Sequence, residues 1–151
     1  MPDKTTALDT VPCIKFTVFG QAKPSGSKRA FIIKGRAIVT DANANSRDWK
    51  NAVSSAAAEH FDGPLLDCPL CVRLRFVVPR PKGHFNSRGE LNKAGAASRF
   101  PAKKPDLLKL ARSIEDSMSG IVFRDDCLIV DEHLQKFWGE PARVEIEIWQ
   151  A

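Results

Sequence analysis

The 151-residue chain has no segment typical of a membrane-spanning or secreted protein. Its apolar runs are all far shorter than the roughly 20 residues that a membrane-spanning helix needs. Residues 1–12, MPDKTTALDTVP, lack the basic and then apolar pattern of a signal peptide. We therefore expect no membrane partner and a cytoplasmic location, and we interpret residues 1–12 as a flexible N-terminal tail.

Cysteine and histidine are too scattered to indicate a zinc centre. Of the four cysteines only Cys68 and Cys71 are close together, and the three histidines show no ligand spacing. A C-x-x-C pair can be half of a zinc site or a redox pair. Because it opens the apolar run CPLCVRLRFVV, packing at the start of a strand is the simpler interpretation. Without a secretory signal we expect free thiols.

The chain also lacks internal repeats and any sign of a second domain. Two helices are predicted, over residues 45–61 and 106–119. Strands are predicted over residues 13–19, 70–78, 121–123, 127–138 and 142–149, with a hairpin over 30–40. This pattern predicts a single α+β domain over residues 13–151, with a mixed β-sheet and two main helices.

Positive charge is concentrated in one part of the chain. The formal net charge is +5, and residues 79–112 carry nine basic residues against two acids. Within this region, residues 79–104 show no periodicity and are rich in Pro, Gly, Asn and Ser, which predicts a long basic loop. We expect this loop to contact phosphate groups; the alternative is a loop whose charges only face solvent.

The second helix has one residue out of pattern. A helix turns by about 100° per residue. The residues of its predicted buried stripe are Leu107, Leu110, Ala111, Ile114 and Met118. The residues of its polar face are Lys109, Arg112, Glu115, Asp116 and Ser119. Leu108 falls in the middle of the polar face, where a leucine is either covered by another element or exposed at some cost.

The acids around this helix allow two interpretations. Taken singly, Asp106 can cap the helix, Asp125 and Asp126 can form a turn, and Asp116 can pair with Arg112. Taken together, they can form a metal site if the turn folds back beside the N-terminus of the helix. Carboxylate oxygens suit Mg²⁺ or Mn²⁺, and such a cation polarises a phosphodiester and activates water.

The stretch KPDLLKLARSIEDSMSGIVFRDDCLIV resembles the signature of the RusA-family Holliday-junction resolvases, which bacteriophages and prophages often carry. That signature reads approximately K-P-D-x-D-N/K-L-x-K/R, then DAL-G and -DD-Q-V. The loop SGSKR and the stretch RPKGHF also fit the family. The matching residues are Lys104, Pro105, Asp106, Lys109, Leu110, Arg112, Asp116, Gly120, Asp125, Asp126 and Val130.

The resemblance implies a homodimer, in a bacterial or phage-infected cell, that cuts four-way or other branched DNA symmetrically with Mg²⁺ or Mn²⁺. It implies that Asp106 and Asp126 act in catalysis as metal ligands, with Asp125 beside them. Arg112 falls at the position of a catalytic lysine, where arginine supplies charge but no titratable amine. The candidate DNA-binding residues are Lys28, Arg29, Arg80, Lys82, Lys103, Lys104 and Lys109.

Leu108 departs from the family pattern, because the second aspartate of the motif belongs there. Its loss removes one ligand and one negative charge from the expected metal site. Glu115 lies seven residues, about 10 Å, further along the helix and is no simple replacement. Three functions stay open: a resolvase in which Asp125 or another acid compensates, a weak or inactive junction-binding protein on the same fold, and a generic basic interaction domain.

Overall fold

A computed structural model of the protein describes residues 11–25, 28–33, 36–41 and 46–151 and leaves out the short segments between them. The expected tail is described only from residue 11 onward. Residues 34 and 35 in the middle of the expected hairpin, and residue 45 at the start of the first expected helix, also lie outside the described residues.

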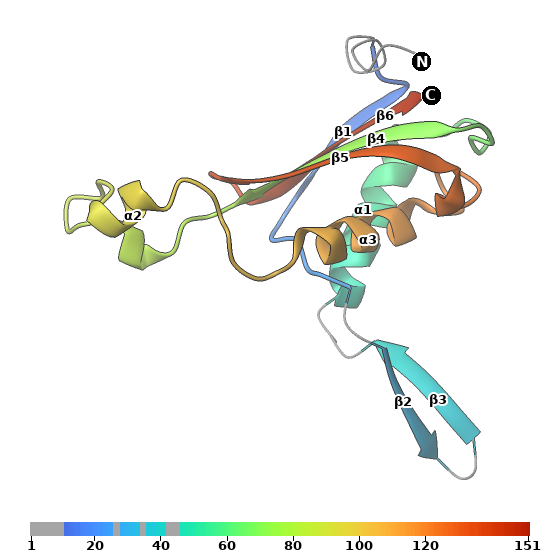
Figure 1. Ribbon diagram of the computed structural model, residues 1–151. Coiled ribbons are helices and arrows are strands. Elements are labelled where there is room, and N and C mark those ends of the chain that lie inside the picture. The colour runs from blue at the N-terminus through green and yellow to red at the C-terminus, as the bar shows by residue number, and fades with distance from the viewer. Residues whose placement is uncertain (1–10, 26–27, 34–35, 42–45) are drawn as a thin grey trace.

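The body of the protein is a mixed four-stranded sheet with the strand order β1-β6-β4-β5 (Figure 1). The β1–β6 and β6–β4 pairs are antiparallel, whereas β4 and β5 are parallel. Parallel neighbours need a long crossover, and the chain between them contains helix α3. The predicted α+β fold with a mixed sheet is confirmed. The strands are β1 (Ile14–Phe19), β4 (Leu70–Val78), β5 (Ile129–Trp138) and β6 (Arg143–Gln150).

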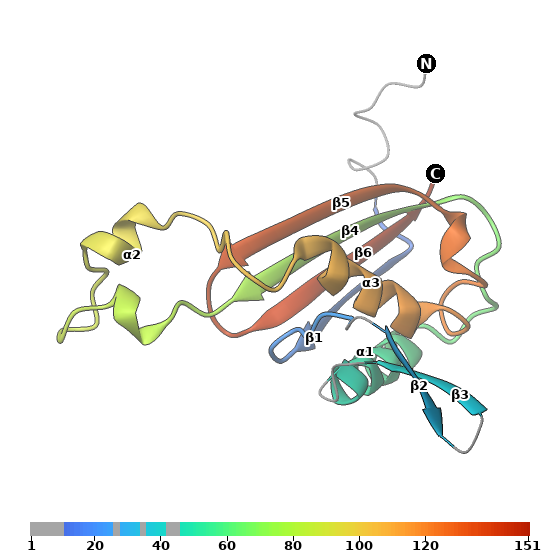
Figure 2. The same cartoon turned by 60° about the horizontal axis from the view of Figure 1, so that its bottom comes forward.

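Two helices, α1 (Ser46–His60) and α3 (Leu107–Met118), cover one face of this sheet (Figures 1 and 2). The predicted stripe of α3 is confirmed, with Leu107 half-buried at its edge and the other four members buried. Strand β6 alternates as predicted, so that Val144, Ile146 and Ile148 are fully buried beneath the helices. Each large apolar side chain buried in this way contributes about 1.5–3 kcal/mol to folding.

The opposite face of the sheet carries rows of paired charges. Glu147 is buried between Arg73, which donates a hydrogen bond to it, and Lys15 at 3.6 Å. Glu145 on the same strand also lies between two arginines. These charges therefore compensate one another on this face of the sheet.

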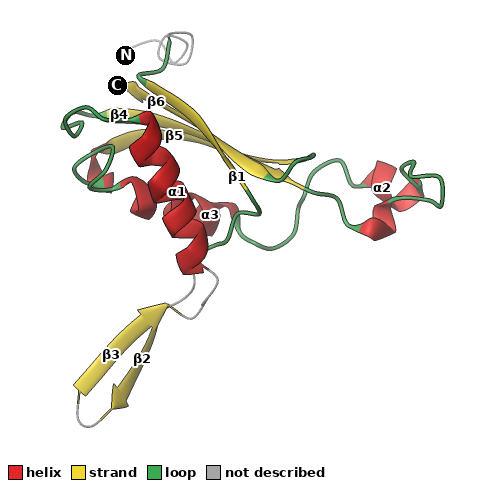
Figure 3. Cartoon of the chain, turned by 180° about the vertical axis from the view of Figure 1, so that it is seen from behind, coloured by secondary structure: helices red, strands yellow, loops and turns green. Residues whose placement is uncertain are grey.

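Strands β2 (Lys28–Ile33) and β3 (Arg36–Asp41) form the predicted antiparallel hairpin. The hairpin makes its own two-stranded sheet and projects from the body beyond α1 (Figures 1 and 3). Only its backbone is described, so the DNA contacts predicted for Lys28 and Arg29 stay predictions.

Residues 79–104, here called the basic lobe, extend beyond the end of the sheet (Figure 1). This segment, predicted as a long basic loop, contains a 3-10 turn, η1 (Lys82–His84), and a short helix, α2 (Lys93–Ala97). Arg80 Nη1 donates to the carbonyls of Gly95 (2.8 Å) and Ser98 (3.1 Å). The Asn92 side chain caps α2 by accepting from the backbone N–H of Gly95. These hydrogen bonds hold the lobe in a defined conformation, although its sequence shows no helical or strand periodicity.

The chain between α3 and β5 is more irregular than predicted. The prediction of a strand over residues 121–123 is wrong, because Phe123 makes only isolated bridges, to Leu66 and Ser119. A 3-10 turn, η2 (Asp126–Leu128), follows and leads into β5. Because Phe123 is fully buried, this irregular segment is anchored beside the C-terminal end of α3.

All four cysteines are free thiols, as predicted. Cys71 is buried at the start of β4, which agrees with a packing role. Across the described ranges, the structure contains no helix that is both long and apolar enough to cross a membrane.

Candidate functional site

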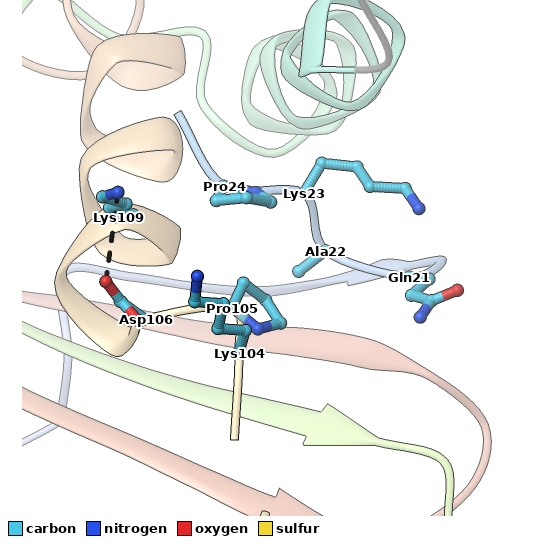
Figure 4. Close-up of a pocket in the computed structure, with 8 residues that line it drawn as sticks. All are labelled: Gln21, Ala22, Lys23, Pro24, Lys104, Pro105, Asp106 and Lys109. Atoms are coloured by element: carbon cyan, nitrogen blue, oxygen red, sulfur yellow. Dashed lines mark ion pairs between the residues drawn. The ribbon is translucent and has the colours of Figure 1, made fainter. Parts of the chain in front are cut away.

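The N-terminal end of α3 borders a basic pocket of about 440 Å³ (Figure 4). Two segments about 80 residues apart in sequence meet there, and each brings lysine side chains. Asp106 is the N-cap residue of α3 but makes no side-chain capping bond, and it pairs instead with Lys109 at 4.0 Å. The pocket can therefore receive an anion. Its lining residues are Gln21, Ala22, Lys23, Pro24, Lys104, Pro105, Asp106 and Lys109.

The first turn of α3 exposes Leu108, at the position where the motif has an aspartate. Leu108 is 73% exposed, so the helical phase predicted from the sequence is correct, and none of the elements that the structure describes covers this leucine. Arg112 lies one turn further on and is exposed, and it forms no ion pair within the described residues. The Asp116–Arg112 pair considered above is not formed, because Asp116 pairs with Lys50 of α1 at 3.5 Å.

The C-terminal half of α3 faces a group of carboxylates, here called the acidic cluster: Glu115, Asp116, Asp125, Asp126 and Glu132. Glu115 shares a hydrogen bond with Glu132 of β5, and the charges of Asp116 and Asp126 also act on it. Asp125 caps η2 by accepting from the backbone N–H of Cys127 at 2.9 Å. The turn therefore delivers its two aspartates beside the C-terminal half of the helix.

Mutual repulsion and burial perturb the titration of this cluster. Burial, followed by the hydrogen bond and charge of Glu132, raises the pKa of Glu115 to about 9. A hydrogen bond with Asp125 raises the pKa of Asp126, whereas the backbone N–H of Cys127 lowers the pKa of Asp125. Acids held this close raise one another's pKa, and a nearby positive charge would offset their repulsion.

A first prediction concerns Glu115→Gln, which we expect to stabilise the metal-free protein at neutral and alkaline pH. A carboxyl whose pKa rises from 4.5 to about 9 on folding destabilises the fold increasingly as pH rises between those values. Glutamine removes that cost and can still donate to Glu132. Thermal melts in EDTA should show a Tm gain of roughly 2–4 °C at pH 8 that vanishes near pH 4.

Glu59→Gln is the matched control, since it removes a carboxylate from an exposed position of α1. It should leave the pH dependence of Tm unchanged. Parallel pH profiles for Glu115→Gln and the wild type would show that Glu115 carries no folding cost.

The structure brings Asp125 and Asp126 together but places Asp106 elsewhere. Asp106 is the N-cap residue of α3, whereas Asp126 feels the charge of Asp116 near the other end of the helix, so the two acids lie toward opposite ends of α3. Asp106 and Asp116 are ten residues apart, about 15 Å along the helix. Within the described ranges, no three His, Cys, Asp or Glu side chains are grouped closely enough to hold a metal ion. The shared cation of Asp106, Asp125 and Asp126 stays a prediction.

The predicted DNA-binding residues of the lobe have different surroundings. Lys82 and Lys104 are exposed, and Lys103 places its ammonium over the Trp138 ring at 5.4 Å. Arg80 is tied into the lobe by its bonds to backbone carbonyls and also lies over Trp138. Arg80 therefore orders the lobe, while the phosphate contacts of the exposed lysines stay a prediction.

Sequence reasoning missed three residues of this region. Glu132 escaped notice because its partner Glu115 is 17 positions away, and only the packing of β5 against α3 unites them. Lys23 follows the first strand and had one signal, its position in a Gly-, Pro- and Ser-rich loop. Trp138 ends β5, and its role as a contact for the lobe had no local signal.

The fold and the charge layout define a class: small α+β proteins in which an acidic cluster and a strongly basic lobe flank one helix, as expected of a nuclease. The comparison with known families agrees, because residues 20–149 match the endodeoxyribonuclease RusA family. The chain belongs to the RusA family of endodeoxyribonucleases. It is also 31% identical over 136 residues to the uncharacterized protein YqaN of Bacillus subtilis (strain 168), covering 90% of this chain and 95% of that protein.

Proposed function

We propose that the protein is a metal-dependent endonuclease that resolves four-way or other branched DNA by paired cuts. The observation that carries this proposal is the family match over residues 20–149, which spans the lobe, α3 and the acidic cluster. The charge layout supports it, since basic groups that attract phosphate and carboxylates that attract a cation lie along the same helix.

The acidic cluster is the place where we propose that Mg²⁺ or Mn²⁺ binds. Its donors are carboxylate oxygens, which these cations prefer, and part of the rise in the pKa of Glu115 and of Asp126 comes from neighbouring negative charge, which a cation would offset. Within the described ranges these side chains are not grouped closely enough to share one ion, so Asp126, Glu115 and Glu132 would have to draw together to hold the cation, with Asp125 fixing the turn. A bound cation supplies polarisation of a phosphodiester and activation of water.

Arg112 is the residue that we propose meets the phosphate next to this site. It lies on α3 between Leu108 and the acidic cluster, and its guanidinium has no ion pair with any described residue. A guanidinium keeps its charge at all relevant pH values and binds phosphate oxygens through two parallel hydrogen bonds. Arg112 would therefore orient the scissile strand and stabilise negative charge as it develops.

A homodimer is part of the same proposal. Two symmetric cuts need two active sites related by a two-fold axis, which a dimer of this chain provides. Light scattering of the purified protein should give twice the mass of the 16.7 kDa chain. A monomer at the concentrations at which paired cuts occur would remove this part of the proposal.

A second candidate function is junction binding without efficient cleavage. The exposed Leu108 favours it, because the family motif has a carboxylate at this position of α3 and this chain has none. Binding to a four-way junction would then be intact, while metal-dependent cleavage is weak or absent. The two functions share the same surfaces and differ only in the chemistry at α3.

Our second prediction is that Lys103→Ala with Lys104→Ala weakens binding to junction and duplex DNA alike. The lobe carries seven basic residues against one acid, so its affinity for phosphate is largely electrostatic. Loss of two phosphate contacts should lower the slope of log affinity against log salt by about 2. Fluorescence anisotropy at several salt concentrations measures both quantities.

Asp67→Asn with Glu59→Gln is a useful control, since it changes two exposed charges outside the lobe. An unchanged affinity and salt slope for the double-lysine variant would mean that the lobe only faces solvent. Equal affinity of the wild type for a four-way junction and a duplex of the same sequence would favour a generic basic domain.

A further inference from the structure

A second cavity, of about 250 Å³, lies where the basic lobe meets the end of β5. Its lining combines three aromatic rings, two guanidinium groups and one carboxylate. The volume is below the roughly 300–1,000 Å³ of sites for drug-sized ligands, which suits a small flat group. The lining residues are Arg80, Phe85, Arg99, Phe137, Trp138, Gly139 and Glu140.

The aromatic wall of this cavity is held in place before any ligand arrives. Trp138 Nε1 donates to the carbonyl of Ser98 at 2.9 Å, and the His84 ring meets its indole edge-on at 5.4 Å. The Arg80 guanidinium lies over the same indole and is fixed by the carbonyls of Gly95 and Ser98. A wall fixed in this way loses little conformational entropy on binding.

Two members of the lining are available to a ligand. Phe85 is 36% exposed although it is a large apolar residue. Arg99 is exposed and makes no hydrogen bond or ion pair with the part of the chain that the structure describes. An open ring next to an unpaired guanidinium matches a nucleotide, whose base stacks on aromatic rings while its phosphate meets arginine.

We propose that this cavity binds an unpaired nucleotide, with the base among the rings of Phe85, Phe137 and Trp138 and the phosphate on Arg99. The base, and not the phosphate, enters among the rings, because Arg80 is already bonded to the carbonyls of Gly95 and Ser98 and the exposed Arg99 is the guanidinium left for the phosphate. The Glu140 carboxylate of the lining can accept a hydrogen bond from the exocyclic amino group of a base. The protein would thereby sense unpaired bases where strands branch.

This inference rests on the proposed function, since it assumes that the chain acts on branched DNA. It adds a contact to a base to the phosphate contacts that are proposed for the exposed lysines of the lobe and for the pocket at the start of α3. The acidic cluster takes no part in it. Cleavage and base capture can therefore fail independently.

The experiment titrates the full chain with a short single-stranded oligodeoxynucleotide and with an abasic strand of the same length. Tryptophan fluorescence reports the cavity directly, because Trp138 is only half-buried whereas Trp49 and Trp149 are 6% and 2% exposed. The ordinary strand should bind about tenfold more tightly than the abasic strand and should change the Trp138 emission.

Two variants test the assignment, and each has a matched control. All four proteins should melt at the wild-type temperature, which shows that they are folded. Phe85→Leu removes the ring but keeps an apolar side chain, and it should abolish most of the preference for the ordinary strand. Phe100→Leu makes the same change at a 59% exposed residue outside this cavity and should keep the preference. Arg99→Ala should weaken binding more than Lys93→Ala, which removes an equal charge from the lobe.

Equal binding of both strands by the wild type would overturn the proposal, as would an intact preference in Phe85→Leu. A protein that cuts junctions but treats both strands equally refutes the base site and leaves the nuclease proposal standing. A protein that prefers the ordinary strand but cuts no junction supports the base site and refutes the nuclease proposal.

Discussion

Leu108→Asp is expected to raise metal-dependent cleavage of a four-way junction by about tenfold or more. The residue is 73% exposed on the polar face of α3, one turn before Arg112. An aspartate there adds a carboxylate at the position where the RusA motif has one, and it removes an apolar side chain from a charged surface. More negative charge beside phosphate should leave metal-free affinity similar or slightly weaker.

Two further variants separate the causes of such a gain. Leu108→Asn removes the apolar side chain without adding charge and should raise cleavage little. Leu65→Asp makes the same substitution at a 41% exposed leucine outside α3 and should change nothing. If the wild type already cuts well and Leu108→Asp cuts equally well, another acid completes the site, and the importance assigned to position 108 is wrong.

Asp126→Asn is expected to lower cleavage by about 100-fold or more, in the wild type and in the Leu108→Asp chain. Asp126 begins η2 and faces Asp116 and Glu115, so its loss removes a donor from the acidic cluster. Asparagine keeps the size of the side chain but not its charge. Anisotropy in EDTA should show junction affinity unchanged or slightly higher.

The control for this variant is Asp67→Asn. Asp67 pairs with Arg124 at 3.0 Å, so it belongs to the same surface region but not to the cluster. Its substitution should leave cleavage within a factor of about 2, as is usual for an exposed ion pair. Cleavage by Asp126→Asn at the wild-type rate would move the metal site away from the acidic cluster.

Local patterns in the sequence predicted most of the fold. Strand β6 alternates strictly, and α3 repeats apolar residues at helical spacing, so each element follows from its own residues. The exposure of Leu108 followed from helical phase alone. These predictions succeed because the burial of one face determines both the element and its orientation.

The site was predicted only in part, because it depends on which segments meet. Asp125 and Asp126 are neighbours in sequence, but the sequence does not say toward which end of α3 their turn folds. The Glu115–Glu132 contact requires β5 to run back along the helix. The order of the lobe depends on Arg80 reaching a carbonyl 18 residues away, which no periodicity reveals.

The most direct test of the nuclease proposal is cleavage of a four-way junction labelled on each strand in turn. The protein should be assayed in Mg²⁺, in Mn²⁺ and in EDTA, with a duplex of the same sequence as the reference. We predict paired nicks at symmetric positions on two opposing strands, only when the cation is present, and no comparable cutting of the duplex. The absence of metal-dependent nicks from both the wild type and the Leu108→Asp chain would contradict the proposed function.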